Sequence, residues 1–436
     1  MKGKKLSKVL ACLLAVVMIF TTLPMMAIAA DVPYVVSYGS PAILMNKDTA
    51  VNLNDIYVEM IDPLKNNGNA GTVSGANITW AATAQDGMIF NATAKTVYAM
   101  KTGNYKLTAT ANGITKNVWV IAKEAAATDF NIVNYDFTKA GSFVPSEWNA
   151  INYGVRPPNQ GTVIPTDGTS DYVSDTTATK GCLTIAGDDV GVLLINKNEI
   201  FKDFRDYTIS YNGVLRTANN VEANGLGAGG RMPLAADGRL DSTKNSIFGF
   251  MRNPGTMRIQ SHRDDYDFWV ESLATNPDIV RDPQDKTTWY WYGSLAHNIK
   301  AVFDGENFAY YLDDKEIFDL SNADAALQEA FKADDVYTID AGYPAIQAWK
   351  GKTDITDFTV KLNSNEMPVA ENVTPSTPDP DPTPDQDPTP GTKPSKPNGP
   401  QTGDNTILAL WAALLFVSGL GIFAITLFGR NKREEN

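Results

Sequence analysis

The chain has 436 residues, 43% of them hydrophobic, and a formal net charge of −13 at pH 7. An acidic chain is poorly suited to non-specific nucleic-acid binding, which depends on Lys and Arg neutralising phosphates, so we expect no nucleic-acid partner. The two cysteines, Cys12 and Cys182, and the two histidines, His262 and His297, are too few for a disulfide framework or a zinc cluster of Cys and His ligands.

The first 30 residues have the three parts of a secretory signal peptide. Several lysines precede an apolar segment at 10–20, and Ala27-Ile28-Ala29 offers small residues for cleavage. We expect residues 1–30 to be removed on export. Cys12 leaves with them, so Cys182 has no partner for a disulfide within the mature chain.

Residues 31–125 contain short segments of alternating apolar and polar residues, which is typical of half-buried strands. Between two of these segments, Asn112-Gly113 predicts a tight hairpin. Trp80 in mid-strand and Gly103-Asn104-Tyr105 before a late strand resemble bacterial immunoglobulin-like domains. That resemblance implies a β-sandwich that spaces or stacks neighbouring domains.

Residues 127–363 repeat the strand pattern and lack the long helices of parallel βαβ units. Asp304-Gly305 and Asp313-Asp314 mark successive tight turns, and a short helix is predicted at 323–332. The segments at 135–149, 207–216, 297–317 and 341–362 resemble concanavalin A-like lectin and glucanase domains of the LamG type. The fold class is therefore all-β, an Ig-like β-sandwich followed by a concanavalin A-like jelly-roll sandwich, with the strand near residue 135 paired to the last strand.

The glycine-rich stretch that begins at Asn224 has Gly225, Gly227 and Gly230 at G-x-G-x-x-G spacing. This spacing indicates a dinucleotide site only where it opens a helix after a strand. Because Arg231-Met232-Pro233 disfavours a helix, we predict a flexible loop at the rim of the concave face.

No pair of carboxylates at the spacing used by glucanases on this fold is visible in the sequence. Aromatic residues are the stronger signal, because a ring can stack on the apolar face of a sugar while polar neighbours bind its hydroxyls. Any of these rings can equally belong to the sandwich core. The candidates for carbohydrate binding are Trp289, Trp291, Trp269, Trp349 and Tyr343.

We expect no cofactor, with a structural Ca²⁺ as the one alternative. Lectin-like sandwiches hold this ion with carboxylates at turns, and Ca²⁺ prefers oxygen ligands. The candidate ligands are Asp304, Asp313 and Asp314, although turn chemistry alone also accounts for aspartate at these positions.

Residues 366–400 are rich in Pro, Thr and Asp and contain nothing that could form a core. Such a composition favours an extended, semi-rigid stalk. An uncharged apolar segment at 407–428 follows, long enough to cross a bilayer, and then a short basic tail that favours the cytoplasmic side.

The order of Pro400-Gln401-Thr402-Gly403, an apolar segment and a basic tail resembles the LPxTG-like sorting signal of Gram-positive surface proteins, over residues 400–436. The resemblance implies that a sortase cuts after Thr402 and joins it to peptidoglycan at the cell wall. Gly399 stands where the common motif has Leu, which leaves the class of sortase open. The alternative is an ordinary C-terminal membrane anchor.

These observations together favour a secreted, wall-anchored surface protein that binds glycan without catalysis. Two alternatives stay open. One is a glycan-active enzyme on the same sandwich, and the other is a structural or adhesive protein whose partner is another protein.

Covalent anchoring gives a direct prediction. Mass spectrometry of digested cell walls should find peptides that end at Thr402 and are joined to peptidoglycan fragments. A mature protein that keeps residues 411–428 and is extracted by detergent would show an ordinary membrane anchor instead.

Overall fold

The structure is a computed structural model. It describes residues 33–61, 69–125, 127, 130–153, 163–186, 191–216, 225–241, 243–244, 246–252, 256–263, 266–275, 296–333, 341–349, 351–364 and 367–368. The described residues all belong to one compact unit. Among the described residues no helix is long and apolar enough to span a bilayer; the predicted span at 407–428 lies outside them, as do the signal peptide and sorting signal.

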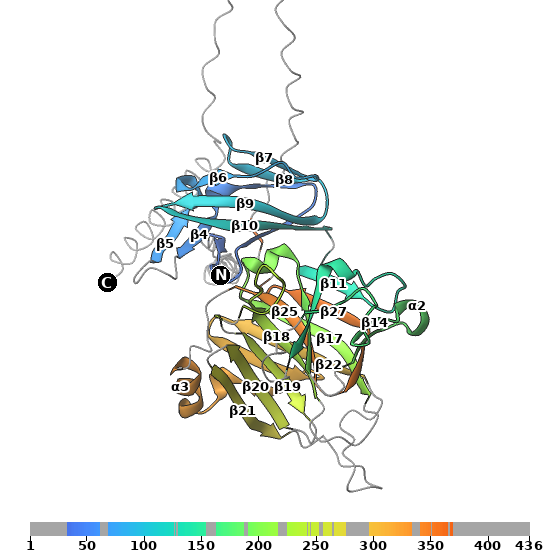
Figure 1. The fold of residues 1–436 in the computed structure, drawn as a ribbon. Helices are drawn as coiled ribbons and strands as arrows, with labels where there is room; N and C mark the ends of the chain where they lie inside the picture. Colours follow the sequence, from blue (N-terminus) through green and yellow to red (C-terminus); the bar gives the residue numbers. More distant parts are fainter. Residues whose placement is uncertain are drawn as a thin grey trace, which may run out of the picture. The chain divides into compact units, whose positions relative to one another are not determined.

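The described chain is all-β, as predicted, and it begins with a smaller set of three sheets (Figure 1). In the first sheet the strand order is β1 (Val35–Val36), β4 (Tyr57–Ile61) and β5 (Asn69–Ser74). In the second sheet the strand order is β2 (Ala42–Asn46), β10 (Ile114–Lys123), β9 (Gly103–Ala111) and β6 (Thr79–Ala81). In the third sheet the strand order is β3 (Thr49–Asn52), β8 (Thr96–Ala99) and β7 (Met88–Asn91). Two short 3₁₀ helices, η1 (Leu53–Asp55) and η2 (Gly75–Asn77), belong to the same part of the chain.

The predicted hairpin joins β9 to β10, with Ala111 paired to Ile114. Asn112 and Gly113 both have positive φ, 54° and 77°, which is the backbone that a type I′ turn requires. One face of this hairpin packs into an apolar core that also includes Trp80. Pairing of β10 with β2 is parallel, which brings the first and last long strands of this part together.

The larger part has two sheets. The nine-stranded sheet orders β14 (Val173–Asp175), β15 (Leu183–Ala186), β26 (Lys352–Ile355), β17 (Tyr207–Arg216), β22 (His297–Asp304), β23 (Asn307–Leu312) and β24 (Lys315–Asp319), with β27 (Asp357–Lys361) beside β17 and β11 (Asn131–Asp136) beside β27. The eight-stranded sheet orders β13 (Val163–Ile164), β12 (Trp148–Tyr153), β16 (Gly191–Asn196), β25 (Tyr343–Trp349), β18 (Gly225–Met232), β19 (Ile247–Arg252), β20 (Thr256–Arg263) and β21 (Tyr266–Thr275).

The two sheets stack around one apolar core. Tyr211 of β17 donates its hydroxyl to the Gly227 carbonyl of β18 at 2.6 Å, and Tyr310 of β23 donates to the Leu226 carbonyl at 3.1 Å. Both tyrosines are fully buried, so these hydrogen bonds satisfy the polar end of each ring inside the core. They also fix the distance between the sheets at their centre.

The predicted closure of the sandwich is confirmed, because β11 pairs antiparallel with β27, with Tyr135 opposite Phe358. The predicted short helix is α3 (Ala325–Ala333). Both predicted tight turns occur, since Asp304 pairs with Asn307 and Leu312 pairs with Lys315 across them. The remaining short helices are α2 (Thr177–Lys180), η3 (Pro145–Glu147), η4 (Glu199–Lys202) and η5 (Leu320–Asn322).

The prediction of a loop in the glycine-rich stretch is wrong. Gly225–Met232 forms strand β18, which is paired along its length with β19 and β25. Glycine weakens an isolated strand, but here two neighbouring strands supply hydrogen bonds on both edges. Leu226 and Ala228 anchor its inner face in the core.

The absence of a disulfide can be tested on a fragment spanning residues 31–365. Cys182 is a free, buried cysteine, 5% exposed. The fragment should fold, and its melting curve by circular dichroism should be the same with and without dithiothreitol. A lower melting temperature in reductant would reveal an interchain disulfide at Cys182.

Candidate functional site

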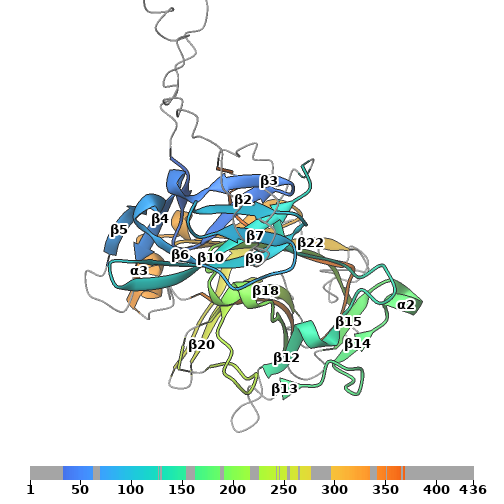
Figure 2. The same ribbon diagram turned by 90° about the horizontal axis from the view of Figure 1, so that it is seen from above.

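The outer face of the eight-stranded sheet follows from its register. Figure 2 shows this sheet curving from β12 through β18 to β20. Leu226 faces the nine-stranded sheet, because its Cδ2 lies close to Gly213 of β17. A Cβ added to this glycine would lie 3.0 Å from Leu226 Cδ2. Successive side chains alternate between faces. Gly227 and the residue paired with it, Gln347, therefore lie on the outer, concave face.

A row of glycines leaves this face without side chains along one strand. Gly225, Gly227 and Gly229 of β18 alternate onto the outer face and pair with Trp349, Gln347 and Ala345 of β25. On the other side of β25, Gly191 of β16 also pairs with Trp349. Trp349 thus has glycine on both neighbouring strands.

Gln347 is the most unusual residue of this face. Its side chain is 0% exposed, and neither Oε1 nor Nε2 has a hydrogen-bond partner in the described part of the chain. A buried amide left unpaired costs about 1–3 kcal/mol. Because the amide offers one acceptor oxygen and two donor hydrogens, a ligand with hydroxyl groups can relieve that cost.

A short turn borders the face at β12. Leu234 and Leu240 form an isolated bridge, and Asn149 donates its Nδ2 to the Gly238 carbonyl at 2.9 Å. Asn149 pairs with Ile195, which places it on the outer face. Gly238 has φ of 83°, and an added Cβ would lie 2.8 Å from Asn149 Nδ2, so the turn needs glycine here.

The structure places two of the five predicted aromatic residues on the same face of one strand. Tyr343 and Trp349 both lie on the outer face of β25, six residues apart. Tyr343 is 8% exposed, and burial raises the pKa of its hydroxyl. Trp349 is half-buried and packs partly against the core.

The other three predicted rings have no described side chain. Trp269 belongs to β21, where its backbone pairs with Gln260 of β20. Trp289 and Trp291 lie in 276–295, outside the described residues. Their assignment to carbohydrate binding stays a prediction.

The calcium candidates occupy turns with partners of their own. Asp313 Oδ2 lies 2.6 Å from His297 Nδ1, and Asp313 Oδ1 accepts a hydrogen bond from the Asn298 backbone. Asp314 pairs with Lys300 at 2.9 Å. In the described ranges, no group of three or more His, Cys, Asp or Glu residues could hold a metal ion. Both turn aspartates have positive φ, so the tight turn itself accounts for them.

Two features of the sequence point to this face when they are interpreted as strand patterns. Glycine at every second position of 225–229 matches the period of one strand face. The segment YPAIQAW likewise has one amide within an apolar strand. A polar residue at a buried strand position is the informative observation in a β core.

No model of a known protein family matches the sequence. No curated protein matches it either. Among solved structures, the catalytic domain of an endo-1,3-β-glucanase (laminarinase) from Thermotoga petrophila is 14% identical, with a TM-score of 0.35, over 54% of this chain and 98% of its own. A carbohydrate-binding module from Bacillus subtilis is 13% identical, with a TM-score of 0.27, over 41% of this chain and 86% of its own.

A further similar structure is a Bacillus subtilis protein of unknown function with a galectin-like fold. It is 8% identical, with a TM-score of 0.32, and the match covers 53% of this chain and 96% of that one. All three TM-scores lie below 0.5, so these likenesses assign neither an activity nor a ligand to this chain.

The role of Trp349 can be separated from that of a core tryptophan by substitution. Trp349→Ala should weaken glycan binding about tenfold, in line with the ~0.5–1.5 kcal/mol that ring contacts contribute beyond burial. Isothermal titration calorimetry measures the affinity, and thermal unfolding measures the stability.

Trp148→Ala is the matched control, because Trp148 is 1% exposed and packs against Tyr135 and Phe358. It should cost about 3–5 kcal/mol of stability. If Trp349→Ala destabilises the fold as much as Trp148→Ala does and leaves affinity unchanged, Trp349 is a core residue.

Proposed function

We propose that the concave face of the eight-stranded sheet binds glycan and that the chain works as a non-catalytic, wall-anchored surface protein. The observation that carries the proposal is Gln347, a fully buried amide without a hydrogen-bond partner among the described residues, on the strand that also holds Trp349. A sugar offers hydroxyls that can bind the amide and an apolar C–H face on which the ring can stack.

The path of the ligand follows from the burial of the two residues. Trp349 is half-buried, whereas Gln347 is buried, so a saccharide first meets the ring at the end of β25. Gln347 lies two residues along the same face and is 0% exposed, so contact between a saccharide and its amide requires the groups that cover the amide to move aside. On β18, Gly225 and Gly227 pair with Trp349 and Gln347, and on β16, Gly191 and Leu193 pair with the same two residues.

Binding is favoured over hydrolysis by the residues at the centre of this face. Glycosidases place two carboxylates on either side of the scissile bond. The sequences of β16, β25 and β18 contain no Asp or Glu. The centre of the described face therefore offers contacts for holding a sugar.

The anchoring part of the proposal rests on the sequence. Pro400, Gln401, Thr402 and Gly403 are followed by the apolar segment at 407–428 and a basic tail. In this account sortase acts on the precursor, peptidoglycan is the covalent partner, and the Pro-rich stalk holds the binding face away from the wall of a Gram-positive cell.

Gln347→Met tests the proposal, because it should raise the stability of the unliganded protein and lower its affinity for glycan. Removing an unpaired buried amide should stabilise the unliganded fold by ~1–3 kcal/mol. The same change should abolish binding to whichever neutral glycan a glycan array identifies with the full chain. A protein that becomes more stable and loses its ligand is expected only if the amide is kept for binding.

Thr353→Val is the matched control. Thr353 of β26 is also 0% exposed, and its Oγ1 has no hydrogen-bond partner in the described ranges, but it belongs to the nine-stranded sheet. This variant should gain stability and keep full affinity. Glycan binding that survives Gln347→Met, or an array on which the intact chain binds no glycan, would overturn the proposal.

A further inference from the structure

A cavity lies where the smaller and larger β-structures meet within the compact unit. Its volume is about 380 Å³, which is within the range of small-ligand pockets. One wall comes from Tyr38, Pro41 and strand β10, and the other from the segment that follows η4.

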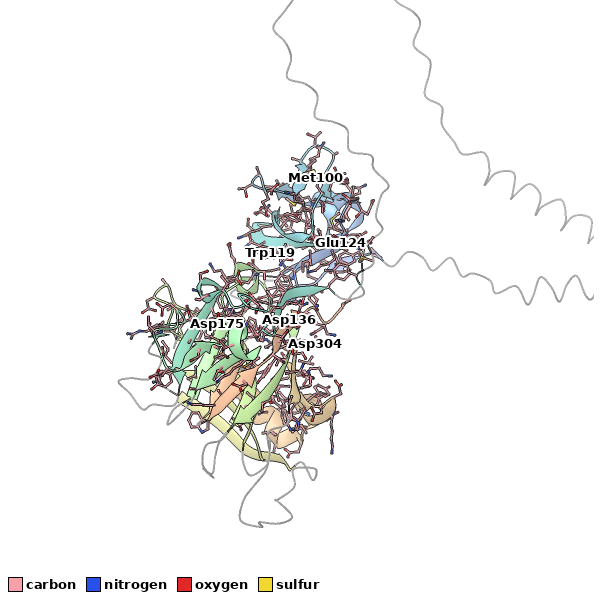
Figure 3. The ribbon with its side chains drawn as sticks, turned by 90° about the vertical axis from the view of Figure 1, so that its right-hand side faces the viewer. Met100, Trp119, Glu124, Asp136, Asp175 and Asp304 are labelled. Atoms are coloured by element: carbon pink, nitrogen blue, oxygen red, sulfur yellow. The ribbon has the colours of Figure 1, made fainter. Side chains whose placement is uncertain are left out.

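Hydrogen bonds hold the two walls together. Trp119 of β10, labelled in Figure 3, donates its Nε1 to Asp203 Oδ2 at 2.8 Å. Asn117 donates Nδ2 to the same carboxylate at 2.9 Å. On the other side of the junction, the Arg205 backbone donates to the Gly39 carbonyl at 2.9 Å. The walls of the cavity are therefore fixed by hydrogen bonds within the folded chain.

The lining is strongly cationic in a chain whose net charge is −13. Four of the lining residues are cationic: Lys116, Lys202, Arg205 and Lys244. The one carboxylate, Asp203, already accepts hydrogen bonds from Asn117 and Trp119. Such a lining attracts an anion and orients it.

Of the four cations, Lys202 and Lys244 are the most available to a ligand. Arg205 Nε is buried and forms an ion pair with Asp206 Oδ1 at 3.4 Å, without a hydrogen bond to the described residues. Lys202 and Lys244 are exposed, and neither has an ion-pair partner in the part of the chain that the structure describes. Lys116 Nζ donates one hydrogen bond, to the Glu59 carbonyl at 2.9 Å.

The ring of Tyr38 holds two of the cations in place. Lys116 Nζ lies 5.2 Å from the ring centroid, and the guanidinium carbon of Arg205 lies 5.0 Å from it. Cations at this distance are attracted to the face of the ring. Both cations are thereby positioned before a ligand arrives.

We propose that this cavity binds an acidic sugar residue, whose carboxylate or sulfate group pairs with Lys116, Arg205, Lys202 and Lys244. The choice of a sugar rests on the proposed glycan-binding function, whereas the negative charge follows from the lining itself. The cavity is distinct from the concave face, so one chain holds a site for neutral sugar and a site for an acidic one.

Protonation of Lys116 gives the binding a pH dependence. Burial lowers the pKa of Lys116 to about 8, while the charges of Glu59 and Asp203 oppose this shift and that of Arg205 adds to it. Lys202 and Lys244 also line the cavity. An anion stabilises the protonated amine, so binding near pH 8 takes up a proton, and affinity falls as the pH rises above 8.

Titration calorimetry of the full chain with galacturonate and with a sulfated monosaccharide tests the proposal, with glucose and inorganic sulfate as comparison ligands. Lys202→Ala/Lys244→Ala should raise the Kd for the acidic sugar about tenfold, since each lysine contributes a charge-assisted contact. At pH 8, the heat of binding should depend on the ionisation enthalpy of the buffer, because a proton is taken up.

Lys101→Ala/Lys139→Ala is the matched control, since it removes two charges from side chains that are 61% and 76% exposed outside the cavity. It should leave the Kd unchanged. Equal affinity of Lys202→Ala/Lys244→Ala and the unaltered chain, or inorganic sulfate binding as tightly as the acidic sugars, overturns the acidic-sugar site. Gln347→Met should affect neutral glycan alone, so failure of one site is distinguishable from failure of the other.

Discussion

The buried pair of Arg231 and Asp206 joins the parts of this fold that matter for function. The Arg231 side chain is 1% exposed, and its Nη2 donates to Asp206 Oδ1 at 3.1 Å and to the Gly305 carbonyl at 2.6 Å. Its Nε donates to the Arg205 carbonyl at 2.9 Å. A buried charge must be paired, and removing one partner costs several kcal/mol. These contacts therefore tie the end of β18 to the start of β17 and to the turn after β22.

The same residue shapes the candidate glycan-binding face. Arg231 has φ of 56°, and the register between β18 and β25 shifts between Gly229 and Met232. The row of glycines in β18 thus ends at this register shift, where the buried Arg231–Asp206 ion pair holds the backbone in place. Gly342 is required beside it, because an added Cβ would lie 2.3 Å from the carbonyl carbon of Arg231. Asp206 also connects to the smaller β-structure, since its backbone amide donates to the Gly39 carbonyl.

Features set by local chemistry were predictable from the sequence. The turns at Asn112-Gly113 and Asp313-Asp314 need positive φ, which Asn, Asp and Gly tolerate. The pairing of the first and last strands of the larger part followed from resemblance, and β11 and β27 confirm it.

Features set by distant strands were not predictable in the same way. Strand β18 is stable because β19 and β25 hydrogen-bond to it, and a local count of glycines favours a loop there. Gln347 becomes informative only when its burial and lack of a partner are known. The cationic cavity likewise combines Tyr38, β10 and the segment after η4, which are far apart in the chain.

The proposed glycan-binding role depends on one amide group, the side chain of Gln347. The side-chain ¹⁵N–¹H resonances of Gln347, assigned by comparison with Gln347→Met, report directly on whether that group meets a ligand. During titration with the neutral glycan, the account predicts a large shift of these resonances and slower exchange of their hydrogens with solvent, as the amide gains hydrogen bonds. Resonances that stay unchanged while the glycan saturates the protein would contradict it.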